Sequence, residues 1–182
     1  MAELVRCFIA IDFPKEIKNE IVRVQRELAK KKMWQGKLTE AENLHLTLKF
    51  LGEISSDKVE EVRKRLREIK FPRFNCYLGN LGVFTPTRIK IVWIHIIGKE
   101  ILGLQKWVDE KLWDLFPKEK RFMSHLTIAR VKNVKDSKLF LEELEKIRAQ
   151  NLKFPVASFS LIKSELKPKG PVYTDIESFK LK

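Results

Sequence analysis

Two short segments, about eighty residues apart, carry the same pair of chemically active side chains. They read Leu44-His45-Leu46-Thr47-Leu48 and Ser124-His125-Leu126-Thr127-Ile128, and they contain two of the three histidines in the chain. The unperturbed pKa of imidazole lies near neutrality, so one histidine of a pair can remove a proton while the other donates one. A threonine hydroxyl can donate a hydrogen bond to a non-bridging phosphoryl oxygen. The duplicated His-x-Thr therefore indicates phosphodiester cleavage by general acid-base catalysis without a metal.

Both segments have the alternating pattern of a half-buried strand, in which the two-residue period decides which side chains share a face. In the first segment the apolar and polar side chains separate, with Leu44, Leu46, Leu48 and Phe50 on one face and His45, Thr47 and Lys49 on the other. The apolar face is expected to lie under a helix and the polar face to be open to water. In the second segment His125 and Thr127 point outward. If two lobes are related by a pseudo-twofold axis, the two polar faces line opposite walls of one groove.

The remaining candidates carry weaker signals. His95 has no threonine two residues later and shares a predicted strand face with Ile91, Trp93 and Ile97, so we expect a core or interface histidine. Lys49 alternates onto the His45 face, where a solvated basic side chain is the simpler interpretation. Phe8 and Trp93 could form walls for a stacked base, but an aromatic residue in a strand is more often part of the core.

Metal and cofactor sites are not expected. Three scattered histidines and two separate cysteines, Cys7 and Cys76, lack the short spacings of a zinc site and predict free thiols in a reducing compartment. No glycine-rich phosphate loop is present, which argues against a dinucleotide-binding or triphosphate-hydrolysing protein.

Strand and helix patterns interleave along the chain and favour an α+β fold. Strands are predicted over 4–11, 44–51, 74–84, 89–97, 124–131, 154–163 and 172–179, and helices from Pro14 to about Trp34 and over 55–69, 99–115 and 136–149. The many short strands favour antiparallel or mixed sheets over a doubly wound parallel sheet. Because the second half repeats the rhythm of the first, we expect the two halves of the sequence to form the two lobes of a single domain over 1–182, without a linker or tail.

The charge favours an anionic partner. The chain has 37 Lys and Arg against 24 Asp and Glu, a net charge of +13, spread evenly with no basic tail. A nucleic acid is the first expectation and a membrane surface the second, although solubility or a hot habitat accounts for the charge equally well. High lysine and glutamate with only 4 glutamines is typical of thermophiles. No apolar run approaches the roughly 18 residues of a membrane span. We expect a cytoplasmic monomer without a membrane partner.

The chain resembles the two-histidine phosphoesterase superfamily and, within it, the RNA 2',3'-cyclic phosphodiesterases, also called 2'-5' RNA ligases. Segments 6–11, 42–52, 125–130 and 164–173 carry the resemblance in the family's order. It implies a bilobal fold, each lobe an antiparallel sheet with helices outside, and a central cleft that holds both motifs. It also implies hydrolysis of RNA ends or nucleosides bearing a 2',3'-cyclic phosphate to 2'-phosphomonoesters, with no metal or nucleotide cofactor.

The resemblance further implies roles for five residues. His45 would be the general acid that protonates the departing 3' oxygen and His125 the general base that activates water, but nothing in the sequence orients the groove, and the two roles could be exchanged. Thr47 and Thr127 would hold phosphate oxygens, with Arg130 as a further phosphate ligand. Strict alternation from His125 puts Arg130 on the opposite face, so either the strand twists or bulges at its end or Arg130 has a structural role instead.

Two other functions remain open. The same site could run 2'-5' RNA ligation, with a 5' hydroxyl of another RNA replacing water as the nucleophile. The cleft could instead belong to a non-catalytic RNA- or nucleotide-binding module. The duplicated imidazoles argue against a purely binding role, since binding alone needs cations rather than titratable groups.

Overall fold

The computed structural model describes residues 4–168 and 170–182. Its strands are β1 (Leu4–Asp12), β2 (Trp34–Leu38), β3 (His45–Ser55), β4 (Phe74–Val83), β5 (Ile91–Ile97), β6 (His125–Val134), β7 (Lys153–Val156), β8 (Ser158–Lys167) and β9 (Gly170–Lys180). Its helices are α1 (Lys15–Lys30), α2 (Ser56–Arg67), α3 (Lys99–Lys111), α4 (Ser137–Glu145) and the short 3-10 helix η1 (Ala41–Asn43). The described strands form two sheets, one with the order β3-β1-β8-β9 and one with the order β2-β6-β5-β4-β7.

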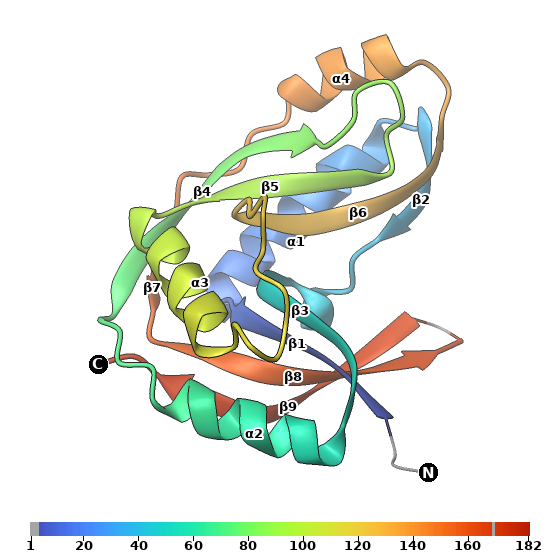
Figure 1. Ribbon diagram of the computed structural model, residues 1–182. Helices are drawn as coiled ribbons and strands as arrows, with labels where there is room; N and C mark the ends of the chain where they lie inside the picture. Colours follow the sequence, from blue (N-terminus) through green and yellow to red (C-terminus); the bar gives the residue numbers. More distant parts are fainter. Residues whose placement is uncertain (1–3, 169) are drawn as a thin grey trace.

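The two sheets lie one above the other, with α4 at the top of the molecule and α2 at the bottom (Figure 1). Helices α2 and α3 pack against β3 of the four-stranded sheet, while α1 packs against β6 and α4 against β4 of the five-stranded sheet. Every strand pairing described is antiparallel. The predicted α+β fold with two antiparallel sheets and outer helices is therefore confirmed. None of the helices in 4–168 and 170–182 combines the length and apolar character needed to cross a bilayer.

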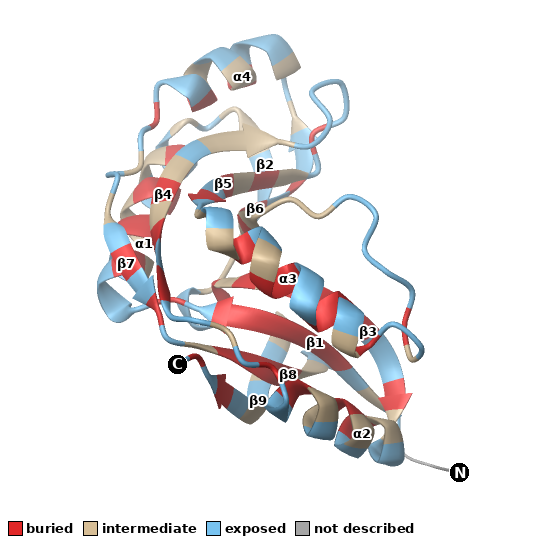
Figure 2. Cartoon of the chain, turned by 60° about the vertical axis from the view of Figure 1, so that its left-hand side comes forward, coloured by how far each residue is buried: buried red, intermediate tan, exposed pale blue. Residues whose placement is uncertain are grey.

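The two lobes do not correspond to the two halves of the sequence, so this expectation is wrong. Strands β8 and β9 join β1 and β3, while β2 and β4 join β5, β6 and β7. The reason lies in β1, whose residues from Cys7 to Ile11 are all buried (Figure 2). A strand buried on both faces must be central in its sheet and needs a neighbour on each side. Strand β3 supplies one neighbour and β8, from the far end of the chain, supplies the other.

Two predicted boundaries are also wrong. The first helix ends at Lys30 rather than near Trp34, and Lys32 adopts a positive φ of 36° in the turn that follows. Trp34 then begins β2, and its indole Nε1 donates a hydrogen bond to the Leu28 carbonyl at 3.0 Å. The strand predicted over 154–163 is two strands in different sheets, β7 and β8. Pro155 fits this arrangement, because β7 is an edge strand and a proline cannot donate to a second neighbour.

Candidate active site

The two His-x-Thr segments open β3 and β6, and the two strands begin with the same order of buried and exposed residues. In each strand the residue after the threonine is a β-bulge. Thr47 and Lys49 oppose consecutive residues of β1, which leaves Leu48 unpaired, and Thr127 and Ala129 oppose consecutive residues of β5, which leaves Ile128 unpaired. A bulge inserts one residue and reverses the alternation that follows it. The side-chain alternation of both strands is therefore reversed at the same distance from the histidine.

The bulges return Arg130 and Phe50, each five residues after its histidine, to the face that carries the histidines. Arg130 lines the same pocket as His125, so the bulge that its predicted role required is present. Phe50 was expected to point into the core but is 71% exposed and lines the pocket, so that prediction is wrong. The prediction failed because a strict two-residue period takes no account of the residue that a bulge inserts.

Lys49, which was expected on the His45 face in solvent, lies instead in the core. Its side chain is 4% exposed, forms an ion pair with Asp109 of α3 and donates to the Pro117 carbonyl at 2.7 Å. Burial by itself raises the pKa of Asp109, but hydrogen bonds from Lys49, the Gln105 amide and the Glu119 backbone N–H hold it below its usual value. The pair ties the first histidine strand to the segment that leads into the second.

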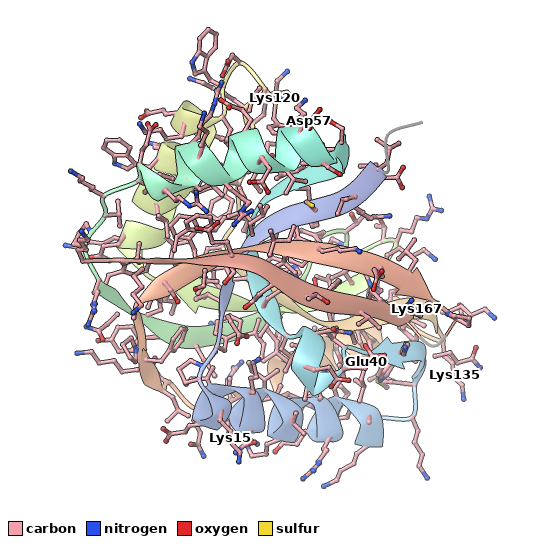
Figure 3. The ribbon with its side chains drawn as sticks, turned by 90° about the horizontal axis from the view of Figure 1, so that it is seen from below. Lys15, Glu40, Asp57, Lys120, Lys135 and Lys167 are labelled. Carbon is pink, nitrogen blue, oxygen red and sulfur yellow. The ribbon has the colours of Figure 1, made fainter. Side chains whose placement is uncertain are left out.

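A pocket between the sheets contains all five predicted site residues. It is lined by His45, Thr47 and Phe50 of β3, by His125, Thr127 and Arg130 of β6, by Lys37, Leu38, Thr39, Glu40 and Asn43 from β2 to η1, and by Pro171 and Tyr173 of β9. The two histidine segments are thus brought to one site from different sheets. Figure 3 shows Glu40 on the β2-to-η1 connection, near the end of the hairpin that carries Lys167.

The two imidazoles are held in the same way. His45 Nδ1 lies 2.8 Å from the Asn43 carbonyl, and His125 Nδ1 lies 2.8 Å from the Met123 carbonyl. A carbonyl oxygen only accepts, so each Nδ1 carries a hydrogen and donates it. This arrangement leaves Nε2 of both rings as the atom that exchanges protons. Nε2 of His45 lies 3.0 Å from Thr47 Oγ1, and the threonine hydroxyl donates to it when the ring is neutral.

His45 sits in an apolar enclosure. Its ring centroid is 4.7 Å from that of Phe8 and 5.3 Å from that of Tyr173. Burial among these rings lowers the pKa of His45 to about 4, against a weaker opposing effect of the hydrogen bond to Asn43. Asp12 raises this pKa slightly, while Lys18 and His125 lower it. His45 is therefore neutral at pH 7 in the empty site, and its charge responds to that of His125.

This lowered pKa predicts a pH dependence of stability. The unfolded chain binds a proton at His45 near pH 6.5, whereas the folded chain binds it only near pH 4, so acidification through this window favours unfolding. When the pH is lowered from about 6.5 to about 4, we expect the unfolding free energy of the wild type to fall by about 2–3 kcal/mol more than that of His45→Gln. Urea unfolding of both proteins across this window measures the difference. Parallel pH profiles would contradict the assignment.

The predictions for His95, Phe8 and Trp93 have different outcomes. His95 is exposed rather than in the core, because Val92, Ile94 and Ile96 form the buried face of β5 and His95 lies on the other. It stands opposite His125 in the β5–β6 pairing but does not line the pocket. Phe8 is part of the buried core, since it is 4% exposed, packs on His45 and does not line the pocket. Trp93 lies opposite Thr127, partly buried, outside the pocket lining.

Several residues of the site were not among the sequence candidates. Asn43 holds His45 through its carbonyl, and its side-chain amide donates to the Pro171 carbonyl at 3.0 Å, which ties β9 to η1. Lys37 pairs with Arg130 across β2 and β6 and forms an ion pair with Glu40. One sequence signal was available for Phe50, since it and Arg130 both follow a histidine at the fifth position. No sequence signal identifies the Met123 carbonyl.

Neither of the two cysteines lines this pocket. Cys7 and Cys76 are free and buried, and burial raises the pKa of their thiols to about 11 and about 12. Within the described part of the chain, no group of three or more His, Cys, Asp and Glu side chains is placed to hold a metal ion. Figure 3 shows Lys15 and Lys120 at opposite edges of the molecule.

Comparisons with known proteins cover nearly the whole chain. The model of the family described as LigT like Phosphoesterase matches residues 11–93 and 97–173, which include both histidine segments. The chain is 35% identical to an RNA 2',3'-cyclic phosphodiesterase of Methanocaldococcus jannaschii over 178 residues, covering 96% of this chain and 100% of that protein. It is 33% identical to the enzyme of the same name from Methanothermobacter thermautotrophicus, covering 97% and 99%. The crystal structure of a Thermus thermophilus protein matches with a TM-score of 0.82 at 27% identity, covering 97% of both chains.

Proposed function

This chain belongs to the LigT-like phosphoesterase family, and from that premise we propose that it hydrolyses the 2',3'-cyclic phosphate ends of RNA to 2'-phosphomonoesters. The relatives that match over nearly their full length are named RNA 2',3'-cyclic phosphodiesterase. The substrate also agrees with the net charge of +13, since a positive protein attracts an anionic RNA end.

One observation carries the proposal. Two histidines from different sheets line one pocket, each fixed by an Nδ1 hydrogen bond to a carbonyl two residues earlier, so both present Nε2 for proton transfer. A site that only bound phosphate would need cations or backbone amides and would gain nothing from two oriented imidazoles. Opening a cyclic phosphodiester needs one proton removed and one delivered, which this pair can supply.

The proposed reaction is an in-line displacement at phosphorus. Water forms a bond to phosphorus while His125 Nε2 accepts a proton from it. The bond from phosphorus to O3' breaks as His45 Nε2 donates its proton to O3', and the phosphate remains on O2'. The charge of the reacting group is unchanged until the monoester later ionises, and the imidazoles recover their starting states by exchange with solvent.

Charge on the non-bridging oxygens increases in the transition state, and three side chains are positioned to stabilise it. The hydroxyls of Thr47 and Thr127 donate hydrogen bonds, with Thr47 exchanging its bond to His45 for one to phosphate. Arg130 adds a charged donor on the His125 side of the pocket.

His45 can serve as the acid only when it is protonated in the complex. Its pKa is low because the imidazole is buried in the empty site, and an anionic phosphodiester opposes this effect by favouring the charged imidazole. Binding of substrate thus supplies the proton donor. Exchanged roles for the two histidines require the opposite result, with His45 remaining neutral in the complex.

The direct experiment is an incubation with an RNA that ends in a 2',3'-cyclic phosphate, in EDTA, with and without a second RNA bearing a 5' hydroxyl. We expect opening of the cyclic phosphate at the same rate with and without EDTA, and hydrolysis to exceed joining because water is far more concentrated than RNA ends. A product of doubled length as the main species would identify a ligase. Tight RNA binding with no turnover would leave only a binding module.

A further inference from the structure

Gln25 is a buried polar residue on α1, the helix that packs against β6. Only 3% of its surface is exposed. Its amide nitrogen donates two hydrogen bonds at 2.8 Å, one to the Thr39 carbonyl and one to the Ile128 carbonyl. A glutamine amide carries two hydrogens on this nitrogen, so both are used. Since an apolar side chain would fill the same space, the two carbonyls account for a buried amide at this position.

One of these carbonyls belongs to the bulge of β6. Ile128 is the extra residue that has no opposite partner on β5. Its carbonyl accepts a second hydrogen bond, from the Thr39 backbone N–H at 2.9 Å. Arg130 follows two residues later and faces the pocket because of this bulge. Gln25 therefore holds the backbone at the point that decides the direction of Arg130.

The other carbonyl belongs to the connection between β2 and η1. Thr39 lies in this connection and lines the pocket. Four residues later, at the end of η1, the Asn43 carbonyl holds His45. The Ile128 bond is the shorter link to the site, because only Ala129 separates Ile128 from Arg130. The stronger effect of Gln25 is therefore expected on the arginine rather than on the histidine.

We propose that Gln25 is a positioning residue that fixes the β6 bulge and so aims Arg130 at the phosphate. The inference rests on the proposed hydrolysis, in which Arg130 stabilises the charge that grows on the non-bridging oxygens. A bulge interrupts the hydrogen-bond ladder, so support from outside the sheet helps to define its geometry. Without the amide, the Ile128 carbonyl keeps one donor instead of two. A displacement of about 1 Å in a positioned group can lower a rate by about 10²-fold.

A double-mutant cycle tests this link. Adenosine 2',3'-cyclic phosphate is given to the wild type, Gln25→Met, Arg130→Gln and the double variant, since methionine matches glutamine in length but has no polar hydrogen. We expect Gln25→Met to lower kcat/KM about 10-fold and Arg130→Gln about 10²-fold, the usual loss for one donor to a developing negative charge. The double variant should match Arg130→Gln within about twofold, because Gln25 acts through Arg130. Losses that multiply, or wild-type turnover by Gln25→Met, would overturn the proposal.

Gln105→Met is the matched control. Gln105 is also a buried glutamine on a helix, with 2% of its surface exposed, but its amide donates to the Asp109 carboxylate at 2.7 Å. This variant loses a buried amide hydrogen bond without touching the β6 bulge, so kcat/KM should stay within about twofold of the wild type. An equal loss of activity in Gln25→Met and Gln105→Met would overturn the positioning role, because any lost amide bond would then have the same effect.

Nitrogen-15 NMR gives a readout that does not depend on turnover. We expect Gln25→Met to shift the Arg130 Nε–H signal and the backbone N–H signals of 128–130, and to weaken the response of Arg130 Nε–H to added adenosine 2'-phosphate. Gln105→Met should leave these signals unchanged. Unmoved Arg130 signals in Gln25→Met would contradict the proposal. Failure of the proposed hydrolysis looks different, since the wild type would then turn over no substrate while the signals still respond to Gln25→Met.

Discussion

His45→Ala and His125→Ala should each lower kcat for a nucleoside 2',3'-cyclic phosphate by about 10²- to 10⁴-fold, the usual contribution of a positioned general acid or base. Without His125, the attacking water keeps its proton until late in the reaction. Without His45, O3' must leave as an alkoxide. KM should change little in either variant, because the proposed phosphate contacts of Thr47, Thr127 and Arg130 would remain.

His95→Ala is the matched control for both histidine variants. His95 stands opposite His125 in the β5–β6 pairing yet lies outside the pocket lining, so its removal should leave kcat within about twofold of the wild type. Near-ultraviolet circular dichroism checks that each variant is folded. Wild-type turnover by both His45→Ala and His125→Ala would exclude the histidines from catalysis.

Lys49→Met should produce the largest loss of stability, about 3–5 kcal/mol, because it leaves the Asp109 carboxylate buried without its cation. The side chains of Lys49 and Asp109 are 4% and 8% exposed, so little solvent is available to replace the lost partner. The substitution also frees the Pro117 carbonyl, which Lys49 holds. Urea unfolding at neutral pH measures the loss.

The double variant Lys49→Met/Asp109→Asn separates the unpaired charge from lost packing. A neutral asparagine can still accept the hydrogen bond from the Glu119 backbone N–H, so we expect it to recover about half or more of the lost stability. Lys58→Met is the control. Lys58 is also partly buried and donates a hydrogen bond to a carbonyl, that of Leu115, but this bond involves no carboxylate. Equal losses in Lys49→Met and Lys58→Met would show that the buried ion pair has no special importance.

Sequence periodicity predicted the elements whose hydrophobic pattern is strong. The helix from Lys15 shows buried Ile17, Ile21, Val24 and Leu28 at the expected spacing, and the apolar run in β1 marks a buried strand. Strand β2 escaped prediction because none of its residues is fully buried. Strand β2 forms because it pairs with β6, and this tertiary interaction cannot be predicted from the local sequence pattern.

The composition of the site was predictable, but part of its geometry was not. Duplicated His-x-Thr identified four residues from their chemistry, and family resemblance added Arg130. The bulges after Thr47 and Thr127 could not be placed by a strict two-residue period, which put Phe50 in the core and Lys49 in solvent. The positions of Lys49 and Phe50 depend on a residue that is distant in sequence. Asp109 on α3 compensates the charge of the buried Lys49 side chain, so that Phe50 can face the pocket.

The most direct test of paired acid-base catalysis at one phosphate is the identity of the monoester product. Wild-type protein is incubated with adenosine 2',3'-cyclic phosphate in EDTA, and the product is assigned by phosphorus NMR against authentic 2'- and 3'-phosphates. We predict adenosine 2'-phosphate alone, because His45 protonates O3' while the phosphate stays on O2'. Adenosine 3'-phosphate, a mixture of both, or no product would contradict this account.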